Sequence, residues 1–145
     1  MSMKVVACGT SGLIGKPLTK ALYQKYELVS LRRKLDPVKS AVTGLEILWN
    51  PPYLSDSWTK EIEGAFAVIN LSGEPLAGKR WTSKQKNALR DSRLNTTRAI
   101  VDVIAKAKVK PKVLVNASAI GIYGPRENES LDENSNPGSG FLSEL

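Results

Sequence analysis

The stretch Gly9-Thr10-Ser11-Gly12-Leu13-Ile14-Gly15 has three glycines in a G-x-x-G-x-x-G pattern. It directly follows the apolar run Val5-Val6-Ala7-Cys8, which is typical of a buried strand, and apolar residues at helical spacing come after it. A glycine loop between a strand and a helix lets the backbone turn sharply and approach a dinucleotide pyrophosphate, whose charge the first helical amides stabilise. We therefore expect all seven residues of this loop to contact a dinucleotide. A purely structural turn is the alternative.

The end of the next strand indicates which dinucleotide is bound. An acidic residue about 20 residues beyond the loop would hydrogen-bond the ribose 2′-hydroxyl of NAD. Here the strand at 27–31 ends instead in Arg32-Arg33-Lys34. A guanidinium group matches a phosphate dianion, so Arg32 and Arg33 favour the 2′-phosphate of NADP(H). A solvated basic turn is the other interpretation.

Strand-like and helix-like segments alternate along the chain. Strands are expected at 5–8, 28–31, 45–49, 65–71 and 113–115, and helices at 13–25, 36–42, 55–63 and 82–108. This alternation predicts an α/β fold, a Rossmann-type doubly wound parallel sheet with strand order 3-2-1-4-5, in one NADP(H)-binding domain spanning 1–145. Ligands should then gather beyond Cys8, Leu71 and Asn116, at the carboxyl ends of strands near the point where the order reverses.

The long helix and the tail are read from their residue patterns. A buried stripe is expected along the helix, formed by Ala88, Leu94, Ala99, Ile100, Val103 and Ile104. Thr82 or Ser83 can cap its start. From residue 121 onward the sequence is rich in Gly, Pro and Asn, which predicts a loop.

Composition sets limits on partners and compartment. The chain has 145 residues and a net charge of +7, from 21 Lys and Arg against 14 Asp and Glu. The cations gather in amphipathic segments and only two Phe are present, so nucleic-acid binding is the weakest interpretation. We expect no membrane span and no signal peptide, and therefore a cytoplasmic protein. The single cysteine, Cys8, lies in a strand and is expected to pack in the core.

The lack of histidine excludes several kinds of chemistry. With no histidine and one cysteine, the chain cannot form the usual zinc or non-haem iron sites, and we expect no metal centre. A Ser-His-Asp or Cys-His nucleophile is excluded as well. Any proton transfer must rest on Tyr, Lys, Asp, Glu or the substrate.

Several motifs spread over the chain point to one family. Besides the glycine loop they are Trp49-Asn50-Pro51, residues 67–74, Arg80-Trp81-Thr82, Ser92-Arg93-Leu94 and residues 117–124. With them the chain resembles the N-terminal half of an extended short-chain dehydrogenase/reductase. More narrowly, it resembles the atypical NAD(P)-dependent epimerase-family branch whose members are often labelled sugar-nucleotide epimerase-like or cell-division-inhibitor-like. Since such relatives continue into a substrate-binding lobe, the resemblance implies that this chain is truncated before that lobe.

The resemblance also implies roles for residues. Leu71, Ser72 and Gly73 would run along the nicotinamide-side ribose and the pyrophosphate of the cofactor. Arg93 stands where typical members place an asparagine on the long helix, and there it could pair with a cofactor phosphate. A helix-surface arginine is the alternative.

The expected catalytic residues differ from those of typical members, which use a Ser after the fifth strand and a Tyr-x-x-x-Lys helix. Ala119 stands at the usual Ser position, with Ser118 one residue earlier. The matching stretch Phe141-Leu142-Ser143-Glu144-Leu145 has neither Tyr nor Lys. Ser118 and Tyr123 are therefore the catalytic candidates, with a structural role as the alternative for Tyr123.

These observations favour an NADP(H)-dependent oxidoreductase or epimerase-like enzyme acting on a small-molecule substrate. The alternative is a non-catalytic NADP(H)-binding module that senses redox state or serves as a scaffold. An uncovered strand edge is expected to favour self-association into a homo-oligomer.

Overall fold

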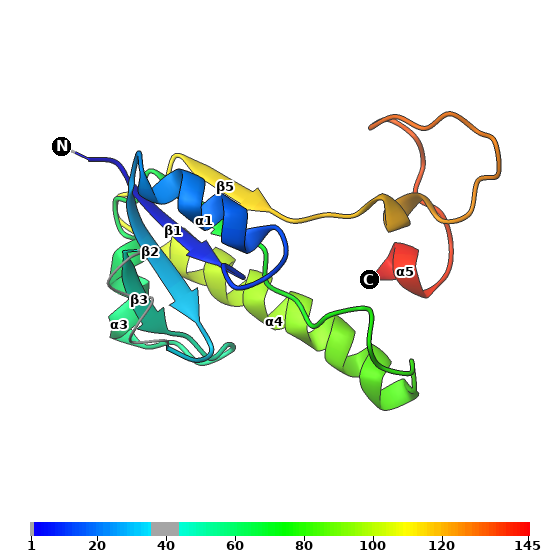
Figure 1. Cartoon of the computed structure of the whole chain (residues 1–145), viewed down its shortest axis with the longest axis horizontal. Helices are drawn as coiled ribbons and strands as arrows, with labels where there is room; N and C mark the ends of the chain where they lie inside the picture. Colours follow the sequence, from blue (N-terminus) through cyan, green and yellow to red (C-terminus); the bar gives the residue numbers. More distant parts are fainter. Residues whose placement is uncertain (1, 36–43) are drawn as a thin grey trace.

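A parallel five-stranded sheet forms the centre of the computed structural model, which describes residues 2–35 and 44–145 (Figure 1). The strands are β1 (Lys4–Cys8), β2 (Glu27–Arg32), β3 (Leu45–Leu48), β4 (Ala67–Asn70) and β5 (Val113–Asn116). The helices are α1 (Gly15–Tyr23), α3 (Asp56–Ile62), α4 (Ser83–Lys106) and α5 (Phe141–Glu144), with a 3-10 helix η1 (Ile120–Tyr123). The strand order β3-β2-β1-β4-β5 confirms the predicted topology. The helix predicted at 36–42 lies outside the described residues.

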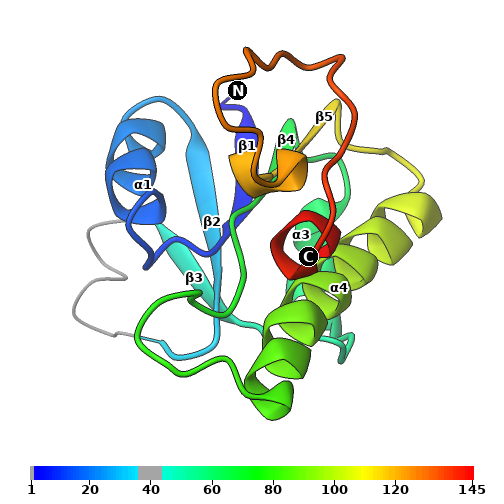
Figure 2. The ribbon, with the colours of Figure 1, turned by 90° about the vertical axis from the view of Figure 1, so that its right-hand side faces the viewer.

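Helices cover both faces of the sheet, as Figure 2 shows. Helix α1 packs through Leu18 and Leu22 on the face that holds Val5 and Ala7. Helices α3 and α4 pack on the opposite face, with the other two residues of the β1 run. Successive strand residues point to opposite faces, so an uninterrupted apolar run is what a strand covered on both sides requires. The run at 5–8 is buried throughout.

Helix α4 begins as predicted but turns a different stripe toward the core. Thr82 Oγ1 accepts a hydrogen bond from the Gln85 backbone N–H at 3.2 Å, which caps the helix. Ala99, Ile100 and Val103 are buried as expected, whereas Ala88 and Leu94 are exposed, and Leu89 and Thr96 are buried instead. With about 100° per residue, positions 89, 96, 100 and 103 fall on one line and positions 88 and 94 fall well outside it. None of the helices in residues 2–35 and 44–145 has the length and apolar character that crossing a membrane requires.

The segment after β5 extends away from the sheet (Figure 1). It is largely irregular, as predicted, but it also contains the short helices η1 and α5, which contact each other. Gly138 allows this chain reversal, because a Cβ there would lie 2.1 Å from the carbonyl oxygen of Tyr123. Among the described residues β5 pairs only with β4, and Val113, Leu114 and Val115 are each more than 40% exposed.

Candidate functional site

A groove of about 460 Å³ opens at the carboxyl ends of β1 to β4. Its walls come from Gly9–Gly12 after β1, Leu31–Arg33 at the end of β2, Trp49–Pro51 after β3, Leu71–Pro75 after β4, and Asp91, Ser92, Asn95 and Thr96 of α4. The groove therefore lies where the strand order reverses between β1 and β4, the place where open α/β sheets bind ligands. It does not extend to Asn116 at the end of β5, contrary to the sequence-based expectation.

Two of the three loop glycines are required by close backbone contacts. Gly9 has φ +77°, and a Cβ there would lie 2.5 Å from both the carbonyl carbon and the oxygen of Leu71. A Cβ at Gly15 would lie 2.2 Å from the carbonyl oxygen of Gly9. At Gly12 the corresponding contact is 3.3 Å, and its N–H donates to the Gly9 oxygen at 3.1 Å. The loop is thus folded tightly on itself and against the end of β4, which keeps the groove open to a ligand.

The structure divides the seven predicted loop residues into two groups. Residues 9–12 line the groove, whereas Leu13, Ile14 and Gly15 do not. Leu13 is 93% exposed, and α1 begins only at Gly15, two residues later than predicted. The hydrogen-bonded turn from Gly9 to Gly12 takes up the residues that the apolar pattern assigned to the helix.

Two polar atoms in the groove wall are buried without a hydrogen-bond partner among the residues that the structure describes. They are the hydroxyl Oγ1 of Thr10 and the indole Nε1 of Trp49. Buried polar groups in native proteins are nearly always paired, so an unpaired one beside a cavity indicates a missing partner. A polar ligand in the groove would supply it.

The two arginines predicted at the end of β2 have different surroundings. Arg32 forms an ion pair with Glu46 of the neighbouring strand β3, whose carboxylate is buried. Arg33 lines the groove, is exposed, and makes no ion pair with residues 2–35 or 44–145. Arg32 is already partly neutralised by a protein carboxylate, so Arg33 is the better placed of the two to bind an anion.

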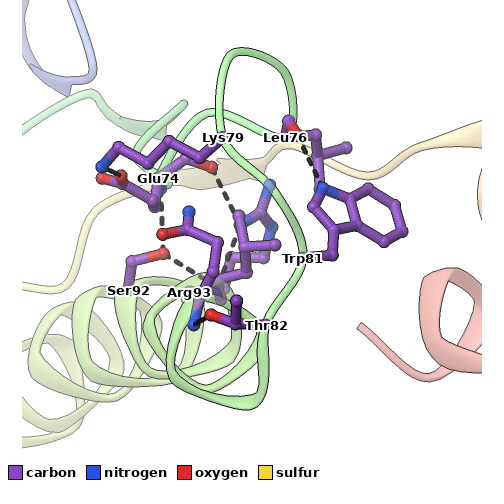
Figure 3. A network of polar contacts seen from close by, with 9 residues as sticks. Glu74, Leu76, Lys79, Trp81, Thr82, Ser92 and Arg93 are labelled. Atoms are coloured by element: carbon purple, nitrogen blue, oxygen red, sulfur yellow. Dashed lines mark hydrogen bonds and ion pairs between the residues drawn. The ribbon is translucent and has the colours of Figure 1, made fainter.

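The loop between β4 and α4 is fastened by side chains of the helix (Figure 3). The Glu74 backbone N–H donates to Ser92 Oγ at 2.9 Å, and Arg93 Nη1 donates to the Glu74 carbonyl at 3.3 Å. Lys79 Nζ lies 2.6 Å from Glu74 Oε1, and its hydrogen bond lowers the pKa of the Glu74 carboxyl group. Ser72 and Gly73 line the groove as predicted, but Arg93 does not.

A polar cluster around Asn70 ties three strand ends together, and the sequence analysis missed it. Asn70 Nδ2 donates to Asn116 Oδ1 at 2.7 Å and to Thr97 Oγ1 at 3.2 Å. Its Oδ1 accepts from the Ser72 N–H and from the Cys8 thiol, both at 3.1 Å. An Asn at the end of two adjacent parallel strands was the signal available. Burial raises the pKa of Cys8 to about 11, so this thiol stays protonated at neutral pH, in agreement with the packing role predicted for it.

The two catalytic candidates lie outside the groove. Ser118 is exposed between β5 and η1, and Tyr123 is half-buried at the end of η1. The carbonyl of Tyr123 accepts a hydrogen bond from Arg126 Nε at 3.0 Å.

Phe141 occupies the position of the Tyr in the Tyr-x-x-x-Lys pattern and serves as a packing residue. Its ring meets that of Trp81 edge-on, with the ring centroids 5.6 Å apart. Lys86 Nζ lies 5.1 Å from the Phe141 ring centroid, within reach of a cation–π interaction. The first turn of α5 is therefore fastened to the start of α4 by apolar and cation–π contacts.

The sheet order, the glycine turn and the groove at the switch point together define a Rossmann-type nucleotide-binding fold. The sequence model of the NAD dependent epimerase/dehydratase family matches residues 5–141. The chain therefore belongs to this family.

Relatives and solved structures agree with this assignment. An epimerase family protein of Mycobacterium bovis is 38% identical over 146 residues, which cover 100% of this chain and 46% of the relative. A chloroplastic homolog in Arabidopsis thaliana is 32% identical, covering 99% of this chain and 42% of the relative. The human epimerase family protein SDR39U1 (isoform 2), solved with NADPH, has a TM-score of 0.79 and 28% identity over 98% of this chain and 45% of the human one. The chain thus spans less than half the length of these proteins.

Proposed function

We propose that this chain binds NADP(H) in the groove and supplies the cofactor-binding part of an oxidoreductase or epimerase-like protein that acts on a small molecule. The glycine turn supports this proposal most directly, because Gly9 and Gly15 bring backbone, not side chain, to the position where a pyrophosphate is bound in such folds. The human relative of known structure, at 28% identity, was solved with NADPH.

The residues of the groove fit such a cofactor. Residues 9–12 would hold the pyrophosphate, with the unpaired hydroxyl of Thr10 as a hydrogen-bonding group. Arg33 would bind the 2′-phosphate, and Leu71 with Ser72 would lie along the nicotinamide-side ribose. When bound, the cofactor supplies hydride transfer, while the protein orients it and excludes water.

Cofactor selectivity tests this proposal. We expect NADPH to bind at least about tenfold more tightly than NADH, equivalent to about 1.4 kcal/mol, because the Arg33 guanidinium pairs with the extra phosphate. Arg33→Ala should remove this preference by weakening NADPH alone. Lys34→Ala is the matched control, since Lys34 is exposed but does not line the groove. Isothermal titration calorimetry measures all four affinities. Equal affinities of the unaltered protein for both cofactors would refute the selectivity.

A non-catalytic cofactor-binding module is the second candidate, and the packing of Phe141 favours it. A phenylalanine has no proton to transfer, and this ring is engaged with Trp81 and Lys86. Following NADPH absorbance with a panel of carbonyl compounds and nucleotide sugars separates the two. For an enzyme we expect turnover that falls at least about a hundredfold in Tyr123→Phe or Ser118→Ala. Cofactor binding without turnover on any member of the panel would favour the module.

A further inference from the structure

We propose that Arg93 and Ser92 form a clamp that shapes the cofactor groove at Gly73 and Glu74, so that Arg93 is a positioning residue and not a phosphate ligand. The inference rests on the proposed cofactor function of the groove. It concerns a contact between the loop after β4 and one turn of α4 (Figure 3).

Consecutive residues of α4 hold both backbone polar groups of Glu74. Ser92 Oγ accepts from the Glu74 N–H at 2.9 Å, and Arg93 Nη1 donates to the Glu74 carbonyl at 3.3 Å. Both side chains are also anchored to the carbonyl of Leu89, Ser92 at 2.9 Å and Arg93 at 3.0 Å. Leu89 is fully buried, so the clamp is fixed to the core of the protein. The loop is therefore held by the helix and not by its own conformation alone.

Gly73 makes room for the guanidinium group. A Cβ at Gly73 would lie 3.2 Å from Cζ of Arg93 and 3.4 Å from each terminal nitrogen. Gly73 does not have a positive φ, so the closeness of Arg93, and not the backbone conformation, favours glycine here. Gly73 and Arg93 are thus complementary in shape, and a change at one is felt at the other.

The clamp acts on the groove from behind its wall. Ser72, Gly73, Glu74 and Ser92 line the groove, whereas Arg93 does not. The guanidinium charge is directed at two carbonyl oxygens of the protein, which leaves it badly placed for a ligand phosphate. Lys79 pairs with the Glu74 carboxylate, which reduces the repulsion that this charge would exert on an anionic cofactor.

A double-mutant cycle between Arg93 and Gly73 tests the clamp. Arg93→Ala and Gly73→Ala should each weaken NADPH binding by about tenfold. The double variant should be no weaker than Arg93→Ala alone, because the added methyl group then meets no guanidinium. NADH should lose affinity by the same factor in each variant. Arg98→Ala is the matched control, since Arg98 lies on the exposed side of α4, and it should bind as the unaltered protein does.

A salt titration separates the clamp from direct phosphate pairing. For a clamp, the dependence of NADPH affinity on ionic strength is the same in Arg93→Ala as in the unaltered protein. A phosphate ligand would instead make that dependence weaker in the variant, and its effect would add to that of Gly73→Ala. Either result would overturn the inference.

The same cycle, measured without ligand, distinguishes failure of the clamp from failure of the proposed function. In urea unfolding, the double variant should unfold at the same urea concentration as Arg93→Ala alone, whereas additive shifts would refute the clamp. If the unaltered protein binds neither NADPH nor NADH, the proposed function is wrong, and these unfolding midpoints still decide whether Gly73 and Arg93 are coupled.

Discussion

Gly9→Ala is expected to lower the affinity for NADPH by roughly 30-fold or more and the free energy of unfolding by about 3 kcal/mol. Two effects add at this position. The φ of +77° disfavours any side chain, and a Cβ would overlap the Leu71 carbonyl group, with 2.5 Å to its carbon and its oxygen. Relief of this overlap moves either the glycine turn or the Leu71–Ser72 segment, and both line the groove. Calorimetric titration and urea unfolding measure the two quantities.

Gly64→Ala is the matched control for Gly9→Ala. Gly64 has a similar φ of +66°, but a Cβ there meets no atom within 4 Å. We therefore expect a loss of about 1 kcal/mol from backbone strain alone, with unchanged affinity for NADPH. The difference between the two variants isolates the contact with Leu71. Equal losses of stability in both, or full NADPH binding by Gly9→Ala, would contradict this account of the turn.

Trp58→Ala is expected to lower the free energy of unfolding by about 3–5 kcal/mol. Trp58 lies in α3, is 1% exposed, and meets Trp49 edge-on with ring centroids 5.8 Å apart. Its removal leaves a large cavity beside a residue that lines the groove, so NADPH affinity should fall as well. Because the Trp58 Nε1 has no hydrogen-bond partner in the described part of the chain, Trp58→Phe loses no hydrogen bond and should cost only about 1–2 kcal/mol.

Trp81→Ala provides the comparison for Trp58→Ala. Trp81 is 38% exposed and donates one hydrogen bond, from Nε1 to the Leu76 carbonyl at 2.9 Å. Its loss should cost no more than about 1–1.5 kcal/mol. Urea unfolding followed by far-ultraviolet circular dichroism gives all three values. A Trp58→Ala variant as stable as Trp81→Ala would show that the α3 side of the core is not closely packed.

Much of the fold was predictable because its signals are local. A strand covered on both faces shows as an uninterrupted apolar run such as Val5–Cys8, and the alternation of strands and helices then restricts the topology to few possibilities. The glycine turn was equally accessible, since only glycine tolerates the positive φ of Gly9. Element ends were less predictable. Leu13 fits a helical pattern, yet the turn places it outside α1.

Sequence alone thus determined the family, the sheet order and the position of the groove, because these depend on residue type and spacing along the chain. The tertiary structure decided which side chains are available within that groove. Arg32 and Arg33 are neighbours of the same type, and only the buried Glu46 of the adjacent strand distinguishes them. Arg93 was equally compatible with a phosphate or with the protein surface, and the carbonyl of Glu74 determines its direction. Such contacts join residues distant in sequence, so they exist only after the chain has folded.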